Sequence, residues 1–278
     1  MIKAWLNFES IGIFATLALL YYGVAVALVL LVFSSPLKAT IKTFTGVVGP
    51  FFSSVAILFA LLTSFLSYDI LERNRQATKA VQSEAGELQN VYSLSVASVT
   101  DMSDIRKALQ AYVSSALQHE WLPASGHSAP DTDAAYDEFL RQLSDPSISR
   151  DASAAVHVAM LSAAVRAGTA RNNRITLSTD RTGELKWISV LLLGVITQVA
   201  IAVVHLERRR AMVAALTVFS TGAIVALGLV ALQEDPFGGV FKVSPVPLER
   251  LLTLPTTLTQ APDAQVQVAP VQVAPATK

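Results

Sequence analysis

The fold is decided by residues 46–92, GVVGPFFSSVAILFALLTSFLSYDILERNRQATKAVQSEAGELQNVY. The first half of this stretch is an apolar run of membrane-spanning length, and the second half is charged, with apolar or small residues at helical spacing. No glycine or proline interrupts the chain between Ala56 and Ala85. The sequence therefore predicts one continuous helix that leaves the bilayer and extends into water.

Three further apolar runs are long enough to span a membrane. The first contains no charged residue between Ile11 and Phe33 and ends at Pro36, which disfavours helix at the preceding residue. A secretory signal is the alternative for this run, but its apolar length exceeds that of a typical signal. We therefore expect an all-α integral membrane protein with four transmembrane helices arranged as two hairpins.

The expected domain organisation places a helical extramembrane insert between the two hairpins. The predicted segments are a first hairpin at 1–68 (helices about 11–33 and 46–68), the insert at 69–182, a second hairpin at 183–232 (helices about 186–206 and 211–232), a DPFGG segment at 233–254, and a disordered Pro/Val/Gln tail at 255–278.

Composition excludes several classes of protein. Only 15% of the 278 residues are charged, the formal net charge is +0, and there is no cysteine. Disulfides and thiolate chemistry are therefore excluded, and no basic field indicates a nucleic-acid partner. The four histidines show no metal-ligand spacing, and no nucleotide-binding or hydrolase motif is present. We expect no enzyme activity, no cofactor and no metal.

One face of the second predicted span carries small and hydroxylated residues. They are spaced at helical intervals: Ser53, Ile57, Ala60, Ser64 and Ser67. A ring of such faces would line a pore, whereas the alternative is that small residues mark close helix contacts. Phe52 and Phe59 lie on the neighbouring face and are candidates for an apolar constriction, with bundle or lipid packing as the alternative.

Two further polar features lie within or beside the membrane. Gln198 falls in the third span, where it can serve conduction or form an interhelical hydrogen bond. Arg171, Arg174 and Arg181 share one face of the last insert helix. They are candidates for an anion-concentrating vestibule, or for contacts with lipid phosphates or with Asp69 and Glu72 of the long helix.

Two short motifs carry a family resemblance. The junction YDILERNR, with Tyr68, Asp69, Glu72 and Arg73, resembles the pattern that follows the second membrane helix of bacterial bestrophins. The element DPFG after the last span is similar to their Asn/Asp-Pro-Phe-Gly element, and is formed here by Asp235, Pro236, Phe237 and Gly238. Over residues 10–254 the chain most resembles a bestrophin-like family of bacterial membrane proteins whose function is unassigned.

The resemblance implies a homo-oligomeric ion channel, pentameric and anion-conducting, whose second transmembrane helix lines the pore. It implies membrane lipid, inorganic ions and copies of the same chain as partners, and no nucleic acid. No carboxylate lies among residues 240–243, so the calcium site of animal bestrophins is not expected. A non-conducting scaffold or sensor, whose insert binds a protein partner, is the alternative.

The resemblance also implies an orientation in a bacterial inner membrane, with the insert and both termini in the cytoplasm. Counting basic residues does not decide it, because both the short hairpin loops and the membrane-proximal ends of the insert are basic. For the DPFGG turn, we expect Phe237 to dock on the insert or on a neighbouring subunit.

Overall fold

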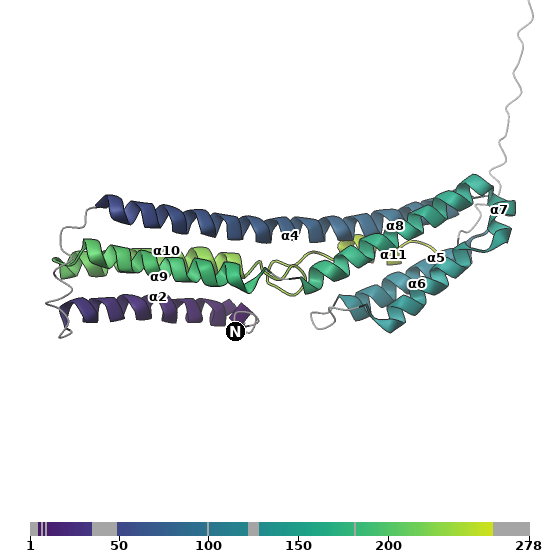
Figure 1. Cartoon of the computed structure of the whole chain (residues 1–278). Coiled ribbons are helices and arrows are strands. Elements are labelled where there is room, and N and C mark those ends of the chain that lie inside the picture. The colour runs from purple at the N-terminus through teal and green to yellow at the C-terminus, as the bar shows by residue number, and fades with distance from the viewer. Residues whose placement is uncertain are drawn as a thin grey trace, which may run out of the picture.

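The computed structural model describes residues 5–6, 8, 10–34, 49–98, 100–121, 128–180 and 182–257. The chain folds into an elongated bundle of helices, and one helix runs from one end of the molecule to the other (Figure 1). In chain order the helices are α2 (Ser10–Phe33), α4 (Gly49–Ala97), α5 (Ser103–Ser115), the π-helix η2 (Ala116–Glu120), α6 (Pro130–Leu143), α7 (Pro146–Ala152), α8 (Ala154–Thr179), α9 (Glu184–Val204), α10 (Arg209–Ala231) and α11 (Val246–Leu252).

Helix α4 confirms the predicted continuous helix. It contains 49 residues, which corresponds to about 73 Å at the rise of an α-helix. Pro50 lies in the first turn, where its missing N–H costs nothing. The helix then runs without interruption across the boundary between its apolar and charged halves, so it connects the two halves of the molecule as a single rod.

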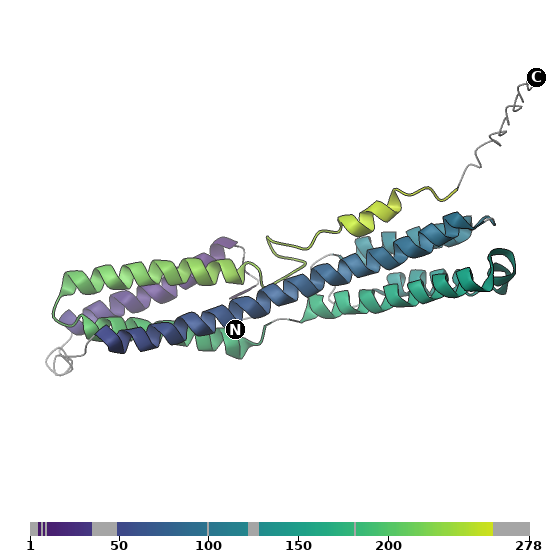
Figure 2. The ribbon, with the colours of Figure 1, turned by 90° about the horizontal axis from the view of Figure 1, so that it is seen from above.

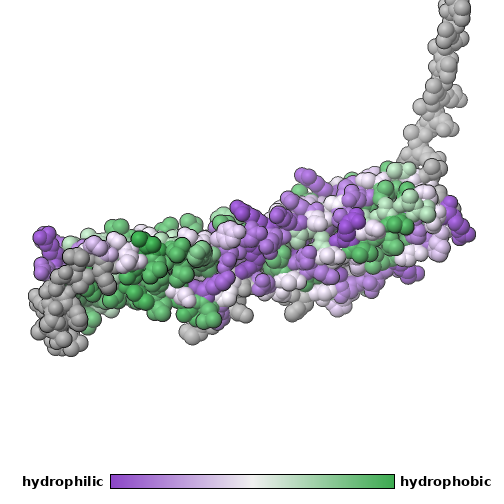
Figure 3. All heavy atoms as spheres, turned by 45° about the horizontal axis from the view of Figure 1, so that its top comes forward, coloured by the Kyte–Doolittle hydropathy of each residue, from purple (hydrophilic) through white to green (hydrophobic). Residues whose placement is uncertain are grey.

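The first half of α4 belongs to a membrane-length bundle with α2, α9 and α10. Four helices in the described residues are long and apolar enough to cross a membrane. In space α4 packs on α9, and α2 packs on α10. The core between them is built from large side chains: Leu17, Tyr21, Leu66, Ile70, Trp187 and Leu227. The outer surface of this half is largely hydrophobic, whereas hydrophilic residues gather from the junction onwards (Figure 3).

The second half of α4 is the spine of the insert. Helix α8 packs along it, and α5 and α6 pack against each other beside the pair. The small side chains on the buried face of α8 allow close approach: Ala163, Ala164, Ala167 and Gly168. At Gly168 an added Cβ would lie 2.1 Å from the Tyr136 hydroxyl oxygen, so a larger residue there would displace the Tyr136 side chain. The insert thus has a core of its own.

One face of α4 remains uncovered along its whole length. Seen from above, α4 can be followed along its length and no helix crosses over it (Figure 2). Exposed positions recur on that face from Ser53 in the membrane half to Ser93 in the insert. A single chain therefore leaves this long surface without a protein partner.

Candidate functional site

The predicted polar stripe lies on the uncovered face of α4. Ser53, Ile57, Ala60 and Ser64 are exposed, and Ser67 is partly buried. The structure therefore brings the five candidate residues onto one accessible surface. The Ser64 hydroxyl donates to the Ala60 carbonyl oxygen at 2.8 Å, and Ser53 donates to the Gly49 carbonyl oxygen at 3.4 Å. With their hydrogens on the helix backbone, these two hydroxyls present oxygen lone pairs outward.

In the single chain Phe52 and Phe59 are partly buried and pack within the bundle, which is the alternative given for them above. The Phe59 ring packs against Phe219 of α10, with ring centroids 5.4 Å apart. Phe52 packs against a cluster that includes Leu216 and Ala215. Both rings gain more by burial within their own bundle than by exposure on the outer face. The bulkiest side chain left on the predicted stripe is Ile57, at 65% exposure.

The Tyr68–Arg73 motif forms a joint between the membrane half and the insert. Arg73 donates to the Glu234 carboxylate at 3.3 Å and contacts Thr182, while Asp69 pairs with Lys186 at the start of α9. Glu234 also accepts from the Thr182 N–H at 2.7 Å. Tyr68 remains exposed, and Glu72 accepts from the Gln76 amide at 3.2 Å. The joint fixes α4 to the start of α9 and the end of α10.

The DPFGG element is a tight turn that folds the chain back onto the insert. The Asp235 carboxylate accepts from the N–H groups of Phe237 at 3.0 Å and Gly238 at 2.8 Å. The Pro236 carbonyl oxygen accepts from the Val243 N–H at 2.7 Å. A Cβ at Gly239 would lie 2.8 Å from the Asp235 carbonyl oxygen, so this position needs glycine.

Phe237 docks on the insert, as the sequence predicts. Its side chain is only 8% exposed and makes an edge-to-face contact with Trp121, with ring centroids 5.7 Å apart. Ala77 and Val81 of α4 and Val243 belong to the same cluster. The turn after the last membrane helix therefore contacts the insert directly, at the level of the joint.

Arg171 and Arg174 are buried in a charge cluster, so they do not line an open vestibule or reach lipid phosphates. The Arg174 side chain is 3% exposed and donates to Glu84 at 2.7 Å and to Glu120 at 3.0 Å. Arg171 pairs with Glu120 and, at 2.7 Å, with Asp133. The predicted partners Asp69 and Glu72, at the membrane end of α4, make no contact with either arginine; the carboxylates are those of Glu84, Glu120 and Asp133. Arg181, the third candidate, lies outside the described residues.

The surroundings favour the charged forms of Arg174 and Asp133 and the neutral form of Tyr112. Burial opposes the charge of Arg174, but the neighbouring carboxylates outweigh it and raise its pKa. Hydrogen bonds from Ser128 and then from Arg171 lower the pKa of Asp133. Burial raises the pKa of the Tyr112 phenol well above its usual range, and the charge of Glu84 adds to this effect. Tyr112 therefore keeps its proton and donates it to Glu84 at 2.6 Å.

Sequence reasoning missed the acidic members of these clusters. Glu84 could have been found, because it falls three residues after Val81 and four before Leu88, on the buried stripe of α4. A carboxylate on such a stripe requires a buried cation. The sequence does not indicate that Glu120 and Glu234 are buried. Each lies just after the end of an apolar pattern, a position where exposed acidic residues are common.

Gln198 forms an interhelical hydrogen bond rather than facing a pathway. Its amide donates to the Tyr21 carbonyl oxygen of α2 and to the Ser220 hydroxyl of α10, both at 2.8 Å. The side chain is fully buried. Gln198 thus ties three membrane helices together, which is the structural alternative for an intramembrane amide.

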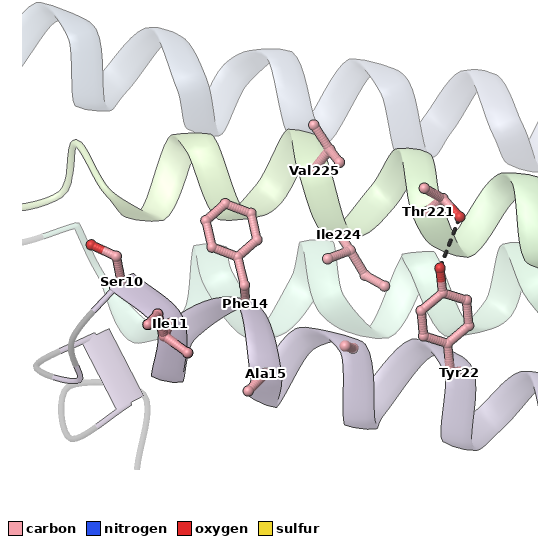
Figure 4. A pocket seen from close by; sticks show the side chains of 9 residues that line it. Ser10, Ile11, Phe14, Ala15, Tyr22, Thr221, Ile224 and Val225 are labelled. Carbon is pink, nitrogen blue, oxygen red and sulfur yellow. Dashed lines mark hydrogen bonds between the residues drawn. The ribbon is translucent and has the colours of Figure 1, made fainter.

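An apolar groove of about 480 Å³ lies between α2 and α10 (Figure 4). Phe14, Ile224 and Val225 line it, and the Tyr22 hydroxyl and the Thr221 hydroxyl bond to each other at 2.8 Å. These two hydroxyls thus satisfy each other. Among the described residues, no group of three or more histidine, aspartate or glutamate side chains could hold a metal ion.

Comparisons with known proteins find a matching family model and solved structures of similar fold. A family model described as the bestrophin-like domain matches residues 19–248. Two crystal structures of variants of a bacterial bestrophin homologue from Klebsiella pneumoniae are similar, both at 14% identity. Their TM-scores are 0.62 and 0.64, covering 86% and 88% of this chain and 96% of each of theirs. A solved membrane protein at 12% identity has a TM-score of 0.65, covering 86% and 96% of the two chains. A search of curated proteins finds no match.

Proposed function

Because this chain belongs to the bestrophin-like family, we propose that it forms a homo-oligomeric ion channel whose pathway is lined by the uncovered face of α4. The observation that carries the proposal is the position of the predicted stripe. Ser53, Ile57, Ala60 and Ser64 are all exposed on one face of a membrane helix. Copies of the chain arranged around this face would enclose the stripe, and pentamers are the arrangement that the family resemblance implies.

The remaining surface of the membrane half suits contact with lipid. Large apolar side chains are exposed on the helices away from the stripe, among them Leu19 of α2 at 78% and Val218 of α10 at 73%. On α4 the stripe instead combines three serines and one alanine with Ile57. Ile57 is therefore our candidate for the narrow apolar ring of the pathway, in place of Phe52 and Phe59.

The proposed permeant class is anions, and the proposed location is the inner membrane with the insert and both termini in the cytoplasm. The orientation has a direct test, because the chain contains no cysteine. Ala134 of α6 and Glu207 after α9 are both exposed and lie in the insert and at the opposite end of the membrane half. We expect an impermeant thiol reagent to label Glu207→Cys, and not Ala134→Cys, in intact cells; the reverse pattern would invert the topology.

The proposed activity is tested by reconstituting the purified protein in liposomes and measuring chloride, sodium and potassium flux in turn. The proposal expects a chloride flux above that of empty liposomes and above the flux of either cation. If the assembled protein carries none of the three ions, the channel proposal is wrong. The alternative, a non-conducting scaffold whose insert binds a partner protein, would then take its place.

A further inference from the structure

The polar stripe by itself gives the proposed channel little reason to prefer anions. Ser53 and Ser64 direct their hydroxyl hydrogens to backbone carbonyls, Ile57 and Ala60 carry no polar group, and Ser67 is only partly exposed. A preference for one sign of charge must then come from residues farther along the same face. Resting on the channel proposed above, we propose that Lys79 of α4 is the site that draws anions into the pathway and sets its selectivity.

Lys79 lies on the uncovered face of α4 in the insert, six residues after Arg73 of the joint. From Ser64 the exposed positions continue through Tyr68, Leu71 and Arg75 to Lys79, at spacings of four, three, four and four residues. This spacing keeps the residues on one side of a helix. An ion that enters the stripe from the insert side therefore passes Lys79 within about three helical turns of Ser67.

The acidic residues around this position are already neutralised by other cations. Asp69 pairs with Lys186, and the Glu234 carboxylate pairs with Arg73 at 3.3 Å. Glu72 remains partly exposed and lies 3.8 Å from the Arg75 guanidinium. Lys79, by contrast, forms no hydrogen bond or ion pair within the described part of the chain. Its ammonium charge is therefore available to a mobile ion.

Lys79 also borders a polar groove of about 640 Å³ between α4 and α8. The groove supplies neutral groups that can donate hydrogen bonds from both helices: Gln76, Ser83, Thr169, Asn173 and Thr176. At one end Arg166 makes a two-point contact with Glu87 at 2.8 and 2.9 Å. Lys79 and Arg166 contribute two positive charges and Glu87 one negative charge, so the groove has a net charge of +1.

This chemistry suits small monovalent anions such as chloride. One ammonium group surrounded by amides and hydroxyls can replace part of the hydration shell of a weakly hydrated anion, without the several cations that a phosphate site usually gathers. In an oligomer the site recurs once in every subunit. The resulting ring of positive charge would raise the anion concentration at the mouth of the pathway.

The test compares the reversal potentials of Lys79→Gln, Lys79→Arg and the parent protein in a potassium chloride gradient. The control is Lys107→Gln, which removes an exposed lysine of α5 that pairs with Asp104. We expect Lys79→Gln to lower the chloride-to-potassium permeability ratio by about 10-fold. Lys79→Arg and Lys107→Gln should keep the parent ratio. The parent preference should also shrink in 1 M salt, where the screening length falls to about 3 Å.

Two different failures can be told apart. If the parent conducts and Lys79→Gln keeps the parent reversal potential, the role of Lys79 is wrong while the channel stands. If the parent carries no current, the channel proposal fails and the role of Lys79 fails with it. Because Lys79 is exposed, we expect its variants to assemble like the parent, and size-exclusion chromatography in detergent checks this.

Discussion

Replacing Arg174 with methionine should destabilise the insert strongly, because it strands a buried carboxylate. Arg174 and Glu84 are 3% and 0% exposed, and they meet through two hydrogen bonds of 2.7 and 3.2 Å. In the variant, Glu84 keeps only the Tyr112 hydroxyl. Glu120 loses one bond but retains Arg171. Leaving one charge of such a pair unpaired costs about 3–5 kcal/mol.

The chain offers a matched control on the same two helices. Arg166 of α8 and Glu87 of α4 also form a two-point contact, at 2.8 and 2.9 Å, but their side chains are 57% and 20% exposed. Water can solvate either partner after the other is removed, so Arg166→Met should cost only about 0.2–1 kcal/mol. Because the two pairs share this geometry and differ in exposure, the comparison measures the effect of burial on stability.

Thermal unfolding of the purified protein in detergent, followed by circular dichroism, measures the difference. We expect the midpoint of Arg174→Met to fall by about 10 °C, and that of Arg166→Met by about 3 °C or less. Adding Glu84→Gln to Arg174→Met should recover part of the loss, since it removes the stranded charge. Equal shifts for Arg174→Met and Arg166→Met, or no recovery in the double variant, would refute the account of the buried cluster.

Two further predictions concern the joint and the membrane core. Phe237→Ala removes a ring that packs against Trp121 and should lower the unfolding free energy in detergent by about 3–5 kcal/mol. The control Phe241→Ala, at a ring that is 57% exposed, should change the unfolding free energy by less than about 1 kcal/mol. Similar values for the two variants would contradict the docking of Phe237. Gln198→Leu removes two hydrogen bonds to α2 and α10 and should cost about 1–2 kcal/mol without abolishing flux; loss of flux in a stably assembled variant would show that Gln198 serves conduction.

Sequence reasoning succeeded where local patterns leave one physical solution. An apolar run that continues into a charged helical pattern without glycine or proline can only be a long helix, and α4 is that helix. The DPFGG turn could be predicted for the same reason, because Pro236 fixes φ, Gly239 permits a close approach that a Cβ would block, and Phe237 needs a place to be buried.

The same reasoning failed where the outcome depends on tertiary partners. Nearly every face of a membrane helix is apolar, so the sequence does not distinguish whether Phe59 faces lipid, a pathway or its own bundle. In the structure Phe59 packs on Phe219 of α10, a contact that only the tertiary fold provides. Arg171 and Arg174 looked like an exposed basic face, because their partners Glu84 and Glu120 come from distant segments. The position of Glu84 on the buried stripe of α4 indicates that a buried cation lies nearby, but no pattern in the sequence identifies Arg174 as that cation.

The measurement that tests the central claim most directly is thiol modification of single cysteines during current recording. The parent contains no cysteine, so Ser64→Cys on the uncovered face of α4 can be compared with Leu19→Cys, which is exposed on α2. We expect a water-soluble, negatively charged methanethiosulfonate to reduce the chloride current of Ser64→Cys at once, and to leave that of Leu19→Cys unchanged. A Ser64→Cys current that is insensitive to the reagent, or a current blocked only through Leu19→Cys, would contradict a pathway along α4.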